Sequence, residues 1–210
     1  MKVIAITTPK VTDEDRHLIG SLIESGIDTI HLRKPDSCIE ECRNLLAQLN
    51  SGARAKIIVH DYPQLYEEFS LKGIHINRNI RELPHNYRGF RTRSCHTLEE
   101  LESCKDGYDY LFLSPVFDSI SKAGYKSGFT AEQLMRASEE GIIDNKTIAL
   151  GGVTLEHIPY LRQLNFGGVA MIGGIYNPEG VEKLKNYIRN SSTGLYTIRA
   201  CPQSHHTGFR

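Results

Sequence analysis

The sequence has no excess charge of either sign and no long hydrophobic run. Its 210 residues carry 25 Lys and Arg against 25 Asp and Glu, so broad electrostatic attraction to nucleic acid or to a membrane surface is not expected. No apolar stretch approaches the roughly 20 residues that cross a bilayer, and the first residues follow a strand pattern rather than that of a signal peptide. We therefore expect a cytoplasmic protein with no nucleic-acid partner and no membrane partner.

Cysteine is scarce, and its spacing fits neither a disulfide framework nor a metal site. The five residues are Cys38, Cys42, Cys95, Cys104 and Cys201, an odd number. Reduced thiols are therefore the prediction. A composition of 40% hydrophobic and 24% charged residues in a chain of this length indicates a single domain with a buried core.

Short runs of β-branched and aliphatic residues alternate with amphipathic stretches, which indicates repeated βα units and a parallel sheet. The expected strands span residues 3–8, 29–32, 56–59, 73–76, 91–95, 110–113, 147–150 and 168–172. The expected helices span residues 13–25, 38–50, 63–71, 98–105, 131–140, 155–163 and 179–190, with only a short helical turn in 79–88. Eight strands favour an α/β fold with a single (βα)8 TIM barrel over residues 1–190, followed by a disordered tail over 191–210.

A doubly wound open sheet is the alternative α/β architecture. Its dinucleotide fingerprint, Gly-x-Gly-x-x-Gly after the first strand, is absent, because residues 8–11 read Thr-Pro-Lys-Val. The barrel is therefore preferred.

Paired glycines follow the last two predicted strands. Gly151 and Gly152 come after one strand, and Gly173 and Gly174 come after the next. Backbone N–H groups at such strand ends approach an anion closely, and barrel enzymes hold phosphate in the loops after strands seven and eight. Tight turns alone are the alternative for either pair, but the two pairs together favour a phosphorylated ligand.

Polar side chains stand at the ends of three other predicted strands, where barrel enzymes place their catalytic groups. Alternation puts His31 and Arg33 on the inner side of strand two. Arg33 suits a phosphate or diphosphate, although pairing with a barrel carboxylate is an alternative. Asp61, at the end of strand three, either holds magnesium or caps the next helix. Ser94, near the end of strand five, is a candidate ligand contact.

The long connection over residues 114–130 carries Ser, Lys and Gly, and in a barrel it would lie over the C-terminal face. A mobile lid over phosphate is the functional interpretation of this loop, and disorder without function is the alternative.

Over residues 3–190, the sequence resembles the thiamine phosphate synthase and thiazole tautomerase superfamily of small (βα)8 barrels, because several motifs of that superfamily occur here in the same order along the chain. The matching segments are residues 26–33, 60–61, 73–76, 94–97, 114–122, 150–153 and 168–172. The resemblance implies a transferase reaction in thiamine biosynthesis. In it, a pyrimidinylmethyl diphosphate loses pyrophosphate and the resulting carbocation is captured by thiazole phosphate, which yields thiamine phosphate.

The resemblance also implies roles for individual residues. Arg33 and Lys122 would neutralise the leaving diphosphate together with Mg²⁺ on Asp61, and Ser94 would lie near the pyrimidine and the pyrophosphate. The other implied substrate contacts are His31, His60, Ser119, Gly151, Gly152, Met171, Ile172 and Gly173. The implied partners are the two small phosphorylated substrates, and the choice between monomer and homo-oligomer stays open.

Two departures from the synthase pattern bear on activity. The family carries a Lys two residues after the strand-two Arg, where this chain has Pro35, and Lys34 stands one residue early and so points elsewhere. Synthases also carry an Asp after strand four as a second magnesium ligand, whereas residues 77–80 here read Asn-Arg-Asn-Ile. One alternative is therefore a tautomerase-like isomerase that uses His31, although Pro115 stands where that branch has its catalytic histidine. The other is a non-catalytic barrel that binds thiazole or thiamine phosphate.

Overall fold

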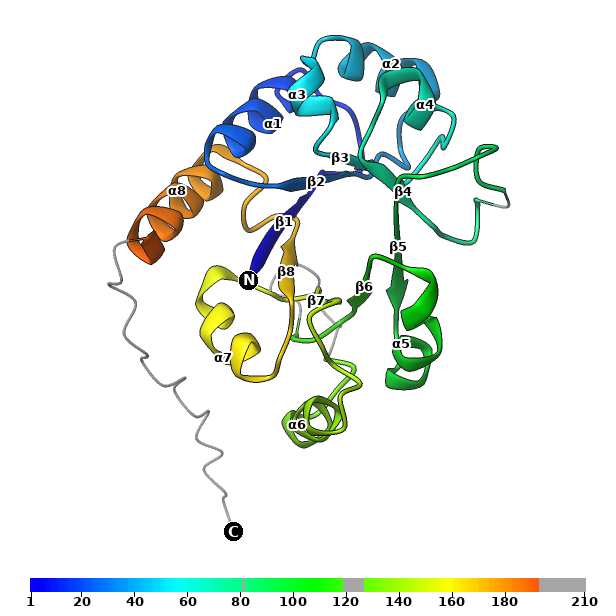
Figure 1. Cartoon of the computed structure of the whole chain (residues 1–210). Coiled ribbons are helices and arrows are strands. Elements are labelled where there is room, and N and C mark those ends of the chain that lie inside the picture. The colour runs from blue at the N-terminus through cyan, green and yellow to red at the C-terminus, as the bar shows by residue number, and fades with distance from the viewer. Residues whose placement is uncertain (81, 119–126, 193–210) are drawn as a thin grey trace.

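The computed structural model describes residues 1–80, 82–118 and 127–192, which form a closed barrel of eight parallel strands (Figure 1). The strands are β1 (Lys2–Ile6), β2 (Thr29–Leu32), β3 (Ile57–Val59), β4 (Gly73–His75), β5 (Phe90–Cys95), β6 (Tyr110–Leu113), β7 (Thr147–Ala149) and β8 (Gly168–Met171). Each strand pairs with the next one in sequence, and β8 closes the barrel against β1. The predicted (βα)8 fold is thereby confirmed.

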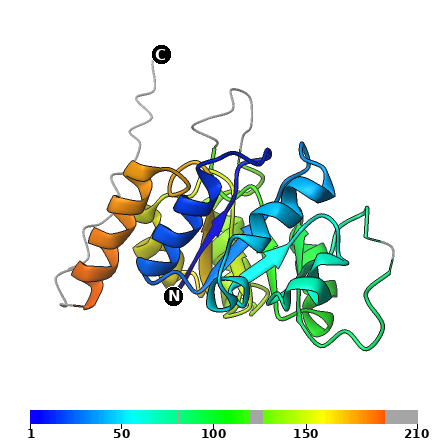
Figure 2. The same cartoon turned by 90° about the horizontal axis from the view of Figure 1, so that it is seen from above.

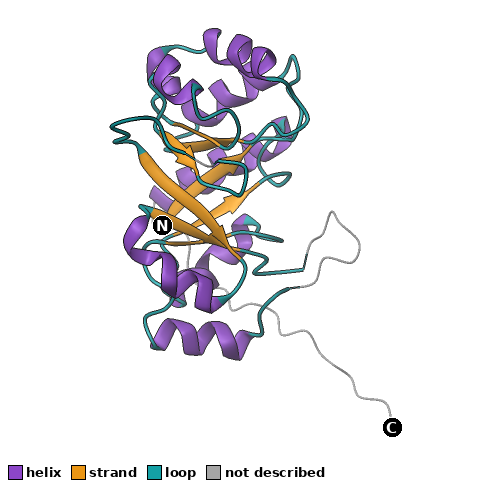
Figure 3. Ribbon diagram, turned by 90° about the vertical axis from the view of Figure 1, so that its right-hand side faces the viewer, coloured by secondary structure: helices purple, strands orange, loops and turns teal. Residues whose placement is uncertain are grey.

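Helices surround the barrel on its outside, as the views in Figures 2 and 3 show. They are α1 (Asp15–Glu24), α2 (Ile39–Ala47), α3 (Ser51–Arg54), α4 (Leu65–Phe69), α5 (Leu98–Cys104), α6 (Ala131–Glu139), α7 (Ile158–Gln163) and α8 (Pro178–Ser192). Two 3₁₀ turns, η1 (Lys105–Gly107) and η2 (Leu155–His157), adjoin α5 and α7. Residues 193–210 lie outside the described part of the chain, so the disordered tail stays a prediction.

Three expected helices differ from the structure for local reasons. The stretch 38–50 ends as α2 at Ala47, and a separate helix α3 follows, because the Asn50 side chain accepts the N–H of Ala53 and caps a new start. The stretch 63–71 ends early at Ser70, which adopts a left-handed conformation. In the stretch 79–88, the described residues contain no helix.

The apolar core has two layers, because successive strand residues face opposite sides of the sheet. One layer fills the barrel interior; it consists of Ile4, Ile6, Ile58, Tyr110, Phe112, Ile148 and Ala170. The larger layer lies between the strands and the helices. Five polar residues of the strands, Thr29, His31, His75, Thr92 and Thr147, are also buried. A buried polar group needs a hydrogen-bond partner, so hydrogen bonds are expected within the buried core at these positions.

In the part of the chain that the structure describes, no helix is long and apolar enough to cross a membrane. The four described cysteines, Cys38, Cys42, Cys95 and Cys104, are free thiols. The prediction of reduced cysteines is confirmed for these four.

Candidate active site

Three strands that neighbour one another in the barrel bring polar side chains together inside it. His31 of β2 is fully buried, and its Nδ1 lies 2.7 Å from Nε2 of His60, which directly follows β3. The other ring nitrogen of His31, Nε2, lies 2.5 Å from the hydroxyl of Tyr110. His75 of β4 stacks on His60 with the ring centroids 4.0 Å apart. We call His31, His60, His75 and Tyr110 the histidine cluster.

The histidine cluster extends to two hydroxyl groups of β5. His75 Nδ1 lies 2.9 Å from Oγ1 of Thr92, and His75 Nε2 lies 3.2 Å from Oγ of Ser94. The strand register accounts for this contact, since Thr92 pairs with His75 on one side and with Tyr110 on the other. The predicted contact residue Ser94 therefore hydrogen-bonds to His75, whose ring stacks on that of His60.

Burial keeps the three imidazoles neutral. Desolvation, followed by the charge of neighbouring groups, lowers the pKa of His31 and His60 well below the usual value. It lowers the pKa of His75 to about 3, with the charge of Arg33 as a further cause. Burial also raises the pKa of Tyr110, so its hydroxyl keeps the proton.

A neutral imidazole has two tautomers, and one orientation of the hydrogen bonds gives the Tyr110 hydroxyl proton an acceptor. Among the described residues, the buried Tyr110 hydroxyl has one hydrogen-bond partner, so its O–H donates to Nε2 of His31. A neutral His31 then carries its proton on Nδ1 and donates it to Nε2 of His60. The proton of His60 is left on Nδ1, which makes this atom a donor.

The three histidines do not form a ready-made transition-metal site, although their nearest nitrogen atoms lie within 4.8 Å of one another. The rings of His60 and His75 are nearly parallel, at 11°, so their lone pairs run side by side instead of converging. The 2.7 Å between His31 and His60 is a hydrogen-bond distance, whereas nitrogens around a tetrahedral zinc are about 3.3 Å apart. The contacts describe hydrogen-bonded and stacked side chains.

Arg33 and Asp61 stand on neighbouring segments at the mouth of the barrel. The Arg33 backbone is fixed by Thr7, which donates to its carbonyl at 3.1 Å and accepts its N–H at 3.0 Å, while its side chain is exposed. Asp61 is half-buried, and its Oδ2 accepts the N–H of Lys34 at 3.0 Å. Asp61 thereby holds the loop that presents Arg33.

The structure decides against both structural alternatives for these two residues. The described part of the chain contains no ion pair between Arg33 and a carboxylate. Asp61 does not cap the following helix, since the N-cap position of α4 is Gln64. An arginine without an ion pair among the described residues, on the segment next to Asp61, therefore needs another explanation.

Lys34 does not join this pair. Its side chain is fully buried, with Nζ 2.7 Å from Asp15 Oδ2 and 2.9 Å from the carbonyl oxygen of Lys10. The hydroxyl of Tyr176 donates to the other oxygen of Asp15. Lys34 therefore points into a buried ion pair, as its position one residue early predicts, and Pro35, where the synthase pattern has lysine, is exposed.

The two glycine pairs differ in the structural reason for having glycine at those positions. Gly151 and Gly152 have positive φ angles of 88° and 64°, and a Cβ on Gly152 would lie 2.3 Å from the carbonyl oxygen of Asp118. Close packing against the loop after β6 therefore suffices to explain this pair. A Cβ on Gly173 would meet no atom within 4 Å. Gly173 follows the buried Met171 and the exposed Ile172, so this backbone is the more open of the two for an anion.

A pair of alanine substitutions tests this difference. Gly152→Ala is expected to destabilise the fold by about 1–3 kcal/mol, because alanine would be strained at this φ and would clash with backbone. Gly173→Ala is expected to leave the free energy of unfolding unchanged within about 0.5 kcal/mol. Urea denaturation of both variants measures this, and equal losses in the two would contradict the assignment.

The described parts of the loop after β6 lie close to these glycines. The N–H of Phe117 donates to the Gly151 carbonyl at 3.0 Å, and the Ser127 hydroxyl donates to the Val116 carbonyl at 2.9 Å. Two predicted site residues, Ser119 and Lys122, lie outside the described residues, so their roles and the lid stay predictions. After β4 the chain has Asn77, whose amide donates to the His60 carbonyl at 2.8 Å.

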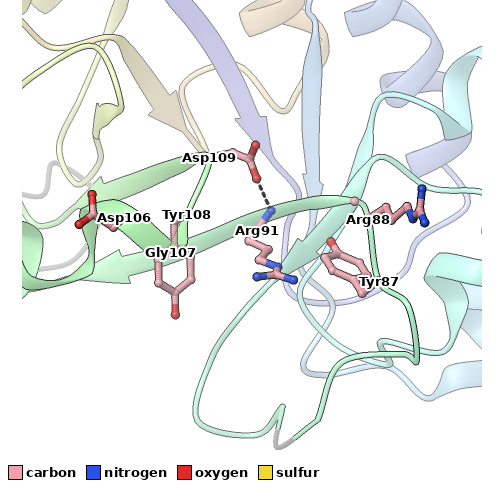
Figure 4. Close-up of a pocket in the computed structure, with 8 residues that line it drawn as sticks. Tyr87, Arg88, Arg91, Asp106, Gly107, Tyr108 and Asp109 are labelled. Carbon is pink, nitrogen blue, oxygen red and sulfur yellow. Dashed lines mark hydrogen bonds between the residues drawn. The ribbon is translucent and has the colours of Figure 1, made fainter.

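A hollow elsewhere on the surface contains none of the predicted site residues. It measures about 320 Å³ and lies at the starts of β5 and β6, lined by Tyr87–Gly89, Arg91 and Asp106–Asp109 (Figure 4). The backbone N–H of Arg91 donates to Asp109 Oδ2 at 2.7 Å, the dashed line in the figure. This hollow is at the opposite end of the strands from Arg33 and Asp61.

Sequence reasoning missed His75, Thr92 and Tyr110 as parts of the site. The available signal was polarity at positions where strand alternation puts a side chain inside the barrel. Position in a strand alone gives residues 75, 92 and 110 no distinct role.

Together these features define a (βα)8-barrel protein with the arrangement typical of phosphate-handling barrel enzymes: cationic and carboxylate side chains at strand ends, and open glycine backbone after the last strand. Comparison with known families gives the particular kind. The model of the thiamine monophosphate synthase family matches residues 3–175, and the chain belongs to this family.

Individual relatives agree with this assignment. The chain is 26% identical over 198 residues to a thiamine-phosphate synthase of Lactococcus lactis, which covers 86% of this chain and 91% of the relative. It is 29% identical over 189 residues to the enzyme of that name from Photorhabdus laumondii, covering 86% and 84%. The crystal structure of a thiamine phosphate pyrophosphorylase from Bacteroides thetaiotaomicron superposes with a TM-score of 0.81 at 32% identity, covering 94% of this chain and 100% of the other.

Proposed function

We propose that this protein is a thiamine phosphate synthase, a transferase that joins 4-amino-2-methyl-5-pyrimidinylmethyl diphosphate to thiazole phosphate with release of pyrophosphate. The observation that carries the proposal is Arg33 at the strand ends, exposed and without an ion pair among the described residues, one residue from the Lys34 N–H that binds Asp61. The charge of Arg33 also reaches His60 of the histidine cluster and helps to lower its pKa. Such a reaction ionises a carbon–oxygen bond, so it needs positive charge on the departing diphosphate. It needs no protein nucleophile.

Each end of the reacting bond finds a suitable environment. Arg33 binds the diphosphate oxygens in a bidentate manner and stabilises the charge that develops on them. The uncharged imidazoles present no cation to repel the pyrimidinylmethyl cation, and Nδ1–H of His60 is a donor for orienting the pyrimidine. Cys95 does not compete as a nucleophile, because burial raises the pKa of its thiol to about 12.

The residues present fit one magnesium ion. Asp61 uses one carboxylate oxygen for the N–H of Lys34, which leaves its second oxygen for a cation, and Mg²⁺ commonly binds through one or two carboxylates plus substrate phosphates. Asp61 would hold the ion against the diphosphate, where it would neutralise charge on the leaving group. The end of β4 supplies an amide, Asn77, rather than a second carboxylate.

The isomerase alternative has less support. Proton transfer needs a titratable group within hydrogen-bond reach of the substrate. Both ring nitrogens of His31 are already occupied, by His60 and Tyr110, and burial holds its pKa well below the usual value. Pro115 has no proton to transfer.

The test is formation of thiamine phosphate by the purified protein from the two substrates, with and without Mg²⁺, read as fluorescence after oxidation to thiochrome. Metal-dependent product supports the synthase with one strand-end carboxylate. Absence of product, with a known synthase active in the same buffer, would refute the proposal. Thiazole phosphate binding without turnover would then identify a binding protein.

Two substitutions are expected to reduce kcat/KM by about 10²–10³, the usual cost of removing one group that stabilises transition-state charge. Arg33→Ala removes the diphosphate contact. Asp61→Asn removes the carboxylate charge but keeps an oxygen that accepts the N–H of Lys34, so the loop is preserved. Arg16→Ala, on the exposed side of α1, is the control and should change nothing. Full turnover by Asp61→Asn at limiting Mg²⁺ would show that the metal assignment is wrong.

A further inference from the structure

A second cavity lies at the end of the barrel opposite to Arg33 and Asp61. Its volume is about 420 Å³, and residues from the starts of successive strands line it: Lys2 of β1, Asp28 and Thr29 at β2, Lys56 before β3, Lys72 before β4, and Tyr110 of β6. The established reaction of the family uses the other face of the barrel, so nothing in the proposed function accounts for this cavity.

Three lysines and one carboxylate line this cavity, which gives it an excess of positive charge. None of the three lysines forms an ion pair with a carboxylate of the described residues. The ammonium groups are close enough to affect one another. Burial lowers the pKa of Lys72, the carboxylate of Asp28 opposes this, and the charges of Lys2 and Lys56 lower it further.

Part of the donor capacity of these lysines is unused. The Nζ of Lys72 donates to the Asp28 carbonyl at 3.2 Å and to Thr29 Oγ1 at 2.5 Å, and the Nζ of Lys56 donates to the Ile27 carbonyl at 3.1 Å. Lys2 Nζ lies 5.7 Å from the centre of the Tyr110 ring and has no hydrogen bond to a described residue. Each ammonium has three donors, so at least one remains on Lys72, two on Lys56 and three on Lys2.

Fixing the loops at the base of the barrel explains only some of this arrangement. Side chains at the N-terminal face of such barrels usually serve stability, and the contacts of Lys56 and Lys72 with backbone carbonyls fit that role. Backbone anchoring explains neither Lys2 nor the presence of three lysines around one cavity. Like charges at short range repel, and a bound anion removes that cost.

We propose that this cavity is a second ligand site for a small phosphate-type anion, orthophosphate or diphosphate, held by Lys2, Lys56 and Lys72. The site is independent of the proposed synthase site and of its outcome. Tyr110 lines the cavity and its hydroxyl contacts His31 of the histidine cluster, so the bound anion would lie one side chain away from that cluster.

The experiment is calorimetric titration of the full chain with inorganic phosphate and, separately, with inorganic diphosphate. Wild-type protein is expected to show a site that the double variant Lys2→Met/Lys56→Met weakens at least tenfold and that Arg33→Ala leaves unchanged. Lys146→Met is the matched control, a lysine before β7 that does not line the cavity. Tighter binding of diphosphate than of phosphate would identify the polyanion as the better ligand.

Two results would overturn the proposal. One is that, in the Arg33→Ala background, no phosphate or diphosphate binding remains or the lysine substitutions leave it intact. The other is a crystal soaked in selenate that shows no anomalous peak in the cavity. If the double variant does not fold, Lys2→Met alone carries the test, because Lys2 makes no side-chain hydrogen bond to described residues. The synthase assay is separate, so an inactive protein that binds phosphate here would refute only the proposed function.

Discussion

Acidification from pH 7 to about pH 4.5 is expected to unfold this protein, because the histidine cluster is buried in its neutral form. His31, His60 and His75 have folded-state pKa values below the unfolded value of about 6.5. Below that pH the unfolded chain binds protons that the folded chain excludes, so the free energy of unfolding falls as the pH falls. Above about pH 6.5 both states are neutral and the three histidines contribute no pH dependence.

The size of the effect follows from the number of groups. Each histidine that titrates only in the unfolded state lowers the stability by about 1.4 kcal/mol per pH unit, so three give about 4 kcal/mol per unit. A typical domain is stable by only about 5–15 kcal/mol. For His75, whose folded pKa is about 3, the loss continues to that pH.

Urea denaturation between pH 7.5 and 5 measures this slope. His75→Asn is expected to reduce it by about one third, whereas His17→Asn, on the exposed side of α1, should leave the contribution of the cluster unchanged. The histidine effect begins near pH 6, well above the range where carboxylates titrate, so the two are separable. A stability that stays flat from pH 7 to pH 5 would show that the cluster is not held neutral.

The barrel was predictable because its signals are local. Eight short apolar runs separated by amphipathic stretches specify strands buried on both faces, and such strands close only in a few ways. Once a barrel is assumed, the rule that chemistry gathers at the C-terminal strand ends places Arg33 and Asp61 next to each other. The two residues do stand on neighbouring segments, since Asp61 accepts the backbone N–H of Lys34, while their roles stay predictions.

The interior of the site was not predictable from one sequence, because it depends on contacts between distant segments. His31 and Tyr110 are 79 residues apart, and only closure of the barrel with a particular register brings them to hydrogen-bond distance. Helix α3 was missed because a single cap at Asn50 decides it. For Lys34 the sequence indicated only that the residue stands out of phase, and its partner Asp15 required the fold.

Removal of Asp15 is expected to cost about 3–5 kcal/mol of stability, because it leaves the buried ammonium of Lys34 without its counter-charge. Both side chains of this pair have 0% of their surface exposed. Asp15 also accepts the hydroxyl of Tyr176 and the backbone N–H of Thr12, so Asp15→Ala strands three donors at once. These donors belong to the loop after β1, the loop after β2 and the segment before α8. Loss of Asp15 therefore destabilises three segments at the mouth of the barrel.

The double variant Lys34→Met/Asp15→Leu removes both charges. Its free energy of unfolding therefore separates the cost of an unpaired charge from the net contribution of the ion pair. Replacing both members of a buried ion pair by apolar groups is often close to neutral, so the double variant should be more stable than Asp15→Ala alone.

Glu179→Ala is the control, since its pair with Lys183 is exposed and such pairs contribute about 0–1 kcal/mol. Guanidinium denaturation gives the four free energies. If Asp15→Ala and the double variant lose the same amount, hydrogen bonding by Asp15 to Thr12 and Tyr176, rather than its charge, stabilises the mouth. Tyr176→Phe then measures how much the hydrogen bond from Tyr176 to Asp15 contributes to the free energy of unfolding.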